Sequence, residues 1–151
     1  MSDMPIYLHF FFASVATIGF SVFFNAPLKA LLPAGVTGGI GWSIYVYLFG
    51  ISSNSIFSNF IAAIAVSLLS EILARKLKQP AILFVIPGII PLVPGLGMYN
   101  TMLYMVQKNF ELGISTGADT IFIGGAIALG VLVITSLSRV FNLIKIRNSI
   151  N

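Results

Sequence analysis

Three prolines and three glycines interrupt the apolar segment between residues 80 and 106. They are Pro87, Gly88, Pro91, Pro94, Gly95 and Gly97. Inside a helix, each proline leaves the carbonyl four residues before it without a donor, here the carbonyls of Leu83, Pro87 and Ile90. Glycine permits the backbone angles of a break and the close approach of another group. The spacing therefore predicts a broken helix whose second half begins near Gly95 or Leu96.

A broken helix of this kind can bind an anion. The first N–H groups of its second half have no partner within the helix, and they carry the positive end of the helix dipole. In secondary transporters such helix ends receive anionic groups of substrates. Tyr99 and Asn100 follow at once and supply hydrogen-bonding side chains. A small molecule with a carboxylate is the expected guest; the alternative is a kinked structural helix whose neighbours satisfy the backbone.

The composition of the whole chain indicates a membrane protein. Of the 151 residues, 58% are hydrophobic and 8% are charged, and the mean hydropathy is +1.02, which is unlike a soluble domain. We expect an all-α, polytopic helical membrane protein that forms one integral membrane domain, residues 1–151, in a lipid bilayer. The net charge of +4 comes from basic residues at segment ends, so nucleic-acid binding is not expected.

Five apolar segments are long enough to cross a bilayer, which takes about 20 residues. They are residues 5–24, 30–49, 56–75, 80–106 and 120–140. The polar residues 107–119 are expected to form a loop, with Asp119 capping the last span. The chain has no cysteine and only one histidine, so no cofactor, metal site or enzyme chemistry is expected.

The basic residues predict which end of the bundle faces the cytoplasm. With five spans, Lys108 stands alone on one side, and seven basic residues share the other: Lys29, Arg75, Lys76, Lys78, Arg139, Lys145 and Arg147. The positive-inside rule then places the N-terminus outside and the C-terminus in the cytoplasm. Arg139, Lys145 and Arg147 are expected to anchor the final helix on the cytoplasmic side. In a four-span alternative, residues 30–49 do not cross, six basic residues lie on the cytoplasmic side and two on the other. This alternative also keeps the C-terminus inside.

Small residues line three of the expected spans. They are Gly35, Gly38, Gly39 and Gly41 in the second, Asn59, Ala63, Ser67 and Ser70 in the third, and Gly124, Gly125, Ala128 and Gly130 in the last. Such faces let membrane helices pack closely, so we expect helix contacts inside a bundle. The alternative for the stripe that begins at Asn59 is a lining of the substrate path.

Four polar residues have two interpretations each. Asn25 and Lys29 follow the first span, where Lys29 either attracts an anionic substrate to the entrance or sets the topology of a helix corner. Glu71 precedes Arg75 by four residues, the spacing of an ion pair on a helix; the alternative is proton coupling. His9 is expected to be a polar residue at the outer interface rather than a ligand or a proton relay.

Two stretches of the sequence resemble a known family. The residues "GFSVFFNAPLKAL" (19–31) and "VIPGIIPLVPGLGMYNTM" (85–102) are similar to the membrane domain of the threonine/serine exporter family, in its small-subunit form. The resemblance covers about residues 13 to 140. Its anchors, in this order, are Gly19-Phe20, the corner Phe24-Asn25-x-Pro27-x-Lys29-Ala30-Leu31, and the break Pro91-x-x-Pro94-Gly95-x-x-x-Tyr99.

The resemblance implies an inner-membrane exporter of small amino acids such as threonine and serine. Related two-subunit members imply, as an alternative, export of a C4 dicarboxylate such as succinate. Single-chain members carry this domain behind a second membrane domain, so a larger membrane subunit of the same family is the expected partner, and a homo-oligomer is a further alternative. Rival interpretations are a non-transporting scaffold that packs against a larger partner, and a passive channel.

The residues expected to lie along the substrate path come from the break and from the corner after the first span. They are Pro87, Gly88, Pro91, Pro94, Gly95, Gly97, Tyr99, Asn100, Asn25 and Lys29, with Glu71 as the candidate for coupling.

Overall fold

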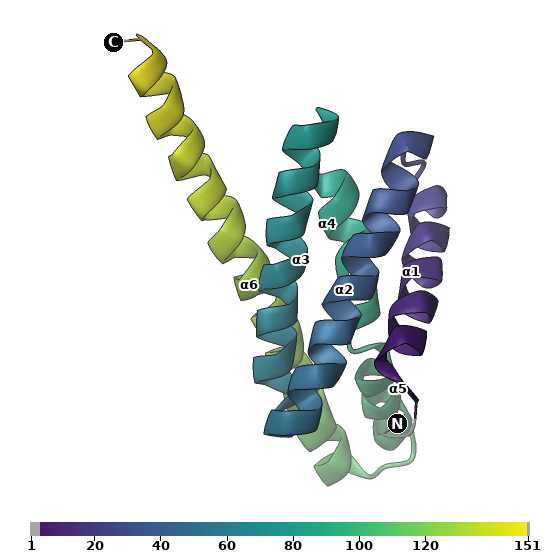
Figure 1. The fold of residues 1–151 in the computed structure, drawn as a ribbon. Coiled ribbons are helices and arrows are strands. Elements are labelled where there is room, and N and C mark those ends of the chain that lie inside the picture. The colour runs from purple at the N-terminus through teal and green to yellow at the C-terminus, as the bar shows by residue number, and fades with distance from the viewer. Residues whose placement is uncertain (1–3, 151) are drawn as a thin grey trace.

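The protein is described by a computed structural model, which covers the backbone of residues 4–150 and the side chains of residues 4–140. Over this range every regular element is helical (Figure 1). The elements are α1 (Ile6–Phe23), α2 (Leu28–Ser52), α3 (Ser55–Leu77), α4 (Ile82–Ile89), the 3₁₀ turn η1 (Ile90–Leu92), α5 (Gly95–Val106) and α6 (Phe110–Ile150). The predicted all-α membrane fold is confirmed.

Four of these helices are long and apolar enough to cross a membrane, namely α1, α2, α3 and α6. The segments Ile82–Leu92 and Gly95–Val106 make a fifth candidate span, which is bent by 51°. The start of α1 and the end of α2 lie at one end of the bundle, while α3 ends at the other (Figure 1). Residues 28–52 form one apolar helix of 25 residues that is long enough to cross, which favours the five-span prediction over the four-span alternative.

The helices α1 and α2 pack closely through the glycines of α2. A Cβ atom on Gly38 would collide with Thr17, and a Cβ atom on Gly39 would lie 2.9 Å from the Phe10 ring. Both glycines are buried. The prediction that these glycines form a helix contact is therefore confirmed, and the contact leaves no room for even a methyl group.

A second close contact joins α2, α3 and α4 around Val66. A Cβ atom on Gly41 would collide with Val66, and one on Gly88 would lie 2.9 Å from the same side chain. Around it lies a core of small and branched residues, namely Ala62, Ala63, Leu92 and Ile127. Gly88, in the proline-rich segment, therefore has a packing role within this chain.

The predicted loop at residues 107–119 is wrong, because α6 already begins at Phe110. The Asn109 side chain accepts a hydrogen bond from the backbone N–H of Leu112, 3.4 Å away. Asp119, the predicted cap, lies exposed inside α6. The polar and small residues that indicated a loop instead pack α5 against α6: Gly113 meets Met105, Gly117 meets Thr101, and Gly97 meets Thr120.

The glycines of the last span divide into two groups. Gly130 is buried against α3, where an added Cβ would lie 2.8 Å from the carbonyl oxygen of Phe60. At Gly124 and Gly125 an added Cβ would meet no atom of the chain within 4 Å. The predicted packing face is thus confirmed only at Gly130. The side chains of Lys145 and Arg147, predicted to be anchors, lie outside the described residues.

Candidate functional site

The break in the bent candidate span divides it into two halves of similar length. Ile82–Leu92 leads into it and Gly95–Val106 leads out. At about 1.5 Å per residue, each half rises by about 16–18 Å, close to half of the hydrocarbon thickness of about 30 Å. When the bent pair crosses the membrane, the break therefore lies near the middle of the bilayer.

The backbone carbonyls at the break are better satisfied than the sequence predicts. The carbonyl of Pro87 accepts from the N–H of Ile90, and the carbonyl of Ile90 accepts from the N–H of Val93 at 3.1 Å. These are bonds over three residues, which tighten the chain into η1. The prediction that both carbonyls lose their partners is wrong, because a 3₁₀ turn supplies donors where the prolines cannot.

The free groups at the break are donors. As predicted, α5 begins at Gly95, and no side chain caps it. Gly95 N–H bonds the carbonyl of Val93 at 2.8 Å and Met98 N–H bonds the carbonyl of Pro94 at 3.1 Å. The N–H groups of Leu96 and Gly97 have no partner among the described residues. Two free donors thus lie at the positive end of the α5 dipole.

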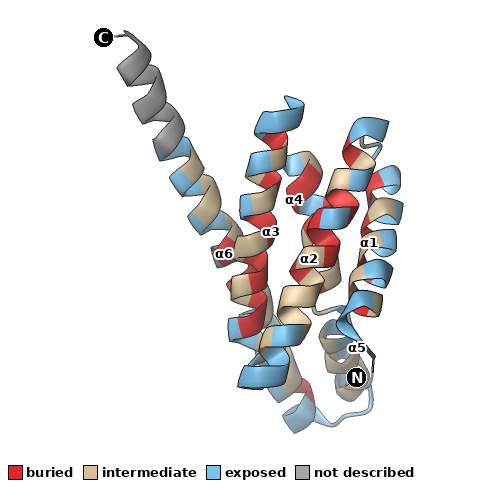
Figure 2. Cartoon of the chain, in the orientation of Figure 1, coloured by how far each residue is buried: buried red, intermediate tan, exposed pale blue. Residues whose placement is uncertain are grey.

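This helix end opens onto the surface of the chain. No residue of α5 is buried (Figure 2). Leu96 is 73% and Tyr99 is 63% exposed, and an added Cβ on Gly95 would meet no atom within 4 Å. The described residues therefore do not enclose the cavity that the sequence predicts in front of α5.

The other predicted pathway residues do not all gather at this point. Pro87 and Gly88 are buried, Pro91, Pro94, Gly97 and Asn100 are half-buried, and Asn25 and Lys29 are exposed. The turn from α1 to α2, which carries Asn25 and Lys29, lies at the end of the bundle away from α5 (Figure 1). A pocket of about 240 Å³ connects this turn with Pro87 instead, and its lining is largely apolar.

Asn25 has a clear structural role in that turn. Its φ of 54° is left-handed, a conformation that asparagine tolerates better than most residues. The N–H of Ala26 bonds the carbonyl of Ser21 at 3.0 Å, which is the bond of a Schellman motif at a helix C-terminus. The geometry favours the helix-corner interpretation of Asn25.

Glu71 forms a link between α3 and α6. Its Oε2 accepts a hydrogen bond from the Ser138 hydroxyl at 2.6 Å and lies 4.0 Å from Nε of Arg75. The Arg75 guanidinium also donates to the Ser138 hydroxyl at 3.0 Å. The predicted ion pair is confirmed, and Ser138 is a partner that the sequence did not suggest.

The polar stripe on α3 is buried among helices. Asn59, Ser67 and Ser70 are all buried, as is Ala63. The amide nitrogen of Asn59 donates to the carbonyl of Ser55 at 2.9 Å. The expected helix contact is confirmed, while a role in a substrate path stays a prediction.

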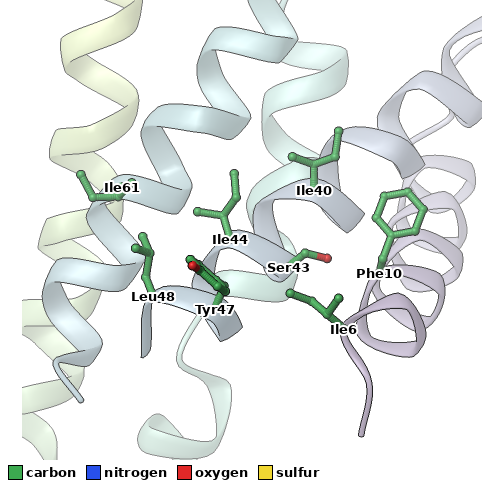
Figure 3. A pocket seen from close by; sticks show the side chains of 8 residues that line it. All are labelled: Ile6, Phe10, Ile40, Ser43, Ile44, Tyr47, Leu48 and Ile61. Atoms are coloured by element: carbon green, nitrogen blue, oxygen red, sulfur yellow. The ribbon is translucent and has the colours of Figure 1, made fainter. Parts of the chain in front are cut away.

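A pocket of about 410 Å³ lies between α1, α2 and α3, away from the break (Figure 3). Eight residues line it: Ile6, Phe10, Ile40, Ser43, Ile44, Tyr47, Leu48 and Ile61. The Ser43 hydroxyl already donates to the carbonyl of Gly39 at 2.8 Å. None of the described residues that line this pocket is charged, so they offer a carboxylate no counter-charge.

His9 is a residue whose surroundings the sequence analysis missed. It is 8% exposed, so its side chain is buried within the chain rather than on its surface; the expected place near the outer membrane interface stays a prediction. The indole N–H of Trp42 donates to its Nδ1 at 3.3 Å, while its Nε2 is buried without a partner among the described residues. A buried donor without a partner costs about 1–3 kcal/mol. The sequence carried a sign of this burial. His9, Ala13, Thr17 and Ser21 follow one another at intervals of four residues, and all four lie on the packed face of α1.

Comparison with known proteins identifies the family. The sequence matches the family described as "Threonine/Serine exporter, ThrE" over residues 9–137, which is most of the chain. The chain belongs to the threonine/serine exporter family. Membership confirms the resemblance, and both stretches that carried it lie within the matched residues. It makes the chain a multi-pass membrane protein of a transporter family, in agreement with its apolar helices.

Two similar proteins are considerably longer than this chain. A protein from Haemophilus influenzae named "Uncharacterized protein" is 32% identical over 127 residues, which cover 79% of this chain and 43% of that protein. A "Threonine/serine exporter" from Corynebacterium glutamicum is 30% identical over 118 residues, which cover 78% of this chain and 24% of that protein. The chain thus spans less than half the length of either relative. No solved structure matches it significantly.

Proposed function

We propose that this chain is one subunit of a secondary exporter for small metabolites that carry a carboxylate. The substrate carboxylate binds at the N-terminus of α5. The observation that carries this proposal is the pair of free backbone donors, on Leu96 and Gly97, at a break halfway along a span. Pro91 and Pro94 hold the break open because neither can donate a backbone hydrogen bond. Tyr99 and Asn100, on the first turns of α5, supply further hydrogen bonds to the substrate.

A second membrane domain completes this site. Free backbone donors in the hydrocarbon region are stable only where protein or a water-filled cavity covers them. Gly95 and Leu96 meet no such cover within the described residues. We therefore place a larger membrane subunit of the same family against α5, with a second copy of this chain as the alternative. The greater length of both relatives supports the first choice.

The substrate class follows from the donors and from the family. A relative named as a threonine/serine exporter favours small amino acids, and backbone donors hold any carboxylate, so a C4 dicarboxylate such as succinate stays the alternative. The excess of basic residues at one end favours a C-terminus in the cytoplasm of a bacterial inner membrane. Export then proceeds from that end outward.

A cysteine at position 96 tests whether the break is a wet substrate site. The chain has no native cysteine, so Leu96→Cys carries a single thiol. We expect a water-soluble maleimide to label it in membranes that contain the whole exporter, and L-threonine or succinate to slow the labelling. Ile121→Cys is the matched control, because Ile121 is 75% exposed and adjoins Thr120, which contacts Gly97 at the same depth.

The control cysteine should react at least about tenfold more slowly, because a thiol in lipid forms little of the reactive thiolate and one pKa unit is a factor of ten. Equal labelling of the two variants, or no protection by any of the tested carboxylates, contradicts a substrate site at the break.

Glu71 stays a candidate for proton coupling, and Glu71→Gln tests it. Because Glu71 already bonds Ser138 and faces Arg75, we expect the variant to lose about 1 kcal/mol of stability and to keep the pH dependence of export. Efflux measured between pH 5.5 and 8 decides the point. A pH profile that becomes flat in Glu71→Gln would assign the coupling to this carboxylate.

One observation favours a scaffold as a second candidate function. Gly124, Gly125 and Ala128 form a small-residue face on α6 that the rest of the chain leaves largely uncovered, and such faces pack against other membrane helices. A subunit that only stabilises its partner in this way would leave export by the partner intact once the partner is supplied in excess.

A further inference from the structure

The bond between His9 and Trp42 determines which nitrogen of His9 carries a proton. An indole N–H is only a donor, so the Nδ1 that accepts from Trp42 at 3.3 Å is unprotonated. The neutral ring therefore carries its proton on Nε2. This N–H is buried without a hydrogen-bond partner among the described residues. His9 thus has an unused hydrogen-bond donor at a position that water does not reach.

His9 also lines a pocket of about 340 Å³, which we call the His9 pocket. Its other lining residues come from one face of α2, namely Trp42, Tyr45, Val46, Phe49 and Gly50, and from Ser53, which follows that helix. The rings of Trp42 and Tyr45 lie 5.1 Å apart, and the ring of Phe49 stacks on that of Tyr45 at 5.8 Å. The pocket combines an aromatic wall with one buried donor, and none of the described residues that line it is acidic.

We propose that the His9 pocket binds a small molecule with a carboxylate and a compact cationic or apolar body. The carboxylate accepts the hydrogen bond of Nε2–H, which no group of the described chain uses. An ammonium group is attracted by the faces of Trp42 and Tyr45, and an apolar body is buried against them. A zwitterionic amino acid fits both parts of the pocket. The choice of amino acids as probes rests on the proposed function, whereas the site itself rests on His9 and its pocket.

Binding in this pocket involves a movement of Trp42. Because Nε2 is covered, a carboxylate reaches it only when the His9 ring turns toward the pocket. When the ring turns, the hydrogen bond from the Trp42 indole to Nδ1 is weakened or broken. This bond is long for an N–H donor, so breaking it costs little energy. Trp42 is the only tryptophan of the chain, and its fluorescence therefore reports on this site alone.

Titration of the purified chain in lipid vesicles, which contain no other protein, tests the proposal. We expect L-threonine to change the Trp42 fluorescence in a saturable way. L-threoninol has the same body and ammonium group without the carboxylate, and we expect it to bind at least about tenfold more weakly, as the loss of a hydrogen bond to a charged group implies. No saturable change with L-threonine or L-serine, or equal affinities for L-threonine and L-threoninol, overturns the proposal.

Two substitutions separate a binding role of His9 from a structural one. In His9→Gln an amide N–H reaches the position of Nε2, and binding should stay within about threefold of the native value. In His9→Asn the amide oxygen reaches only the position of Nδ1, so Trp42 keeps its acceptor while binding weakens by at least about tenfold. Ser43→Ala, which changes a residue of α2 that lines the other pocket, should leave binding unchanged.

If His9 only ties α1 to α2, His9→Asn will bind like the native chain, and the proposal fails. This result is independent of the α5 site. If substrates slow the maleimide labelling of Leu96→Cys but leave the Trp42 fluorescence unchanged, only the proposal for the His9 pocket fails. If the fluorescence changes but the labelling is not slowed, only the proposed substrate site at α5 fails.

Discussion

Replacing Gly95 by leucine should reduce export at least about tenfold while the chain stays folded. Gly95 is the first residue of α5, its φ is not positive, and an added Cβ would meet no atom within 4 Å. Leucine also favours a helix more than glycine does. Its side chain, however, tilts toward the helix N-terminus and covers the free donors of Leu96 and Gly97. Losing even one hydrogen bond to a charged carboxylate costs about tenfold in affinity.

Efflux of labelled L-threonine, L-serine and succinate from cells that express the whole exporter measures this effect. Gly19→Leu is the control, because Gly19 is an exposed helical glycine where an added Cβ is equally free of contacts. Both variants should reach the membrane at native levels. If Gly95→Leu exports at the native rate, the N-terminus of α5 is not part of the substrate path.

The second large effect concerns stability. Replacing Gly38 by alanine should destabilise the protein by about 1–3 kcal/mol, the usual cost of overpacking a full interior. The new methyl group collides with Thr17, which is fully buried and bonded through its hydroxyl to the carbonyl of Ala13 at 2.8 Å. The helices α1 and α2 must then move apart, because neither side chain has space to yield.

Thr17→Ala should restore part of this loss, because it removes the two atoms of Thr17 beyond Cβ. Thermal unfolding in detergent of the native chain, each single variant and the double variant gives the coupling between the two sites. We expect Gly38→Ala to be the least stable of the four and the double variant to recover. Additive losses would show that the two residues do not collide.

The sequence predicts the parts of the fold in which backbone chemistry decides the outcome. Prolines cannot donate, so the break after Pro94 and the start of α5 at Gly95 could be predicted. The buried glycines of α2 could also be predicted, because in a membrane small residues at helical spacing indicate close packing. These conclusions need no knowledge of which helix lies opposite.

Where the opposing surface decides, the sequence was misleading. Residues 107–119 have the composition of a loop, yet Gly113 and Gly117 are small because α5 packs there. Gly124 and Gly130 are the same residue type on one helix, but only Gly130 meets α3. The bond from Trp42 to His9 joins residues 33 positions apart, and no local pattern reveals that Trp42 is its partner.

We propose that the break in this chain becomes a transport site only against a second membrane domain. Efflux of preloaded labelled L-threonine, L-serine and succinate tests it in three kinds of cells: with this chain alone, with the larger subunit alone, and with both. We predict efflux only when both are present. Full efflux from the larger subunit alone would contradict the account and reduce this chain to a scaffold, and efflux from this chain alone would show that its broken helix needs no partner.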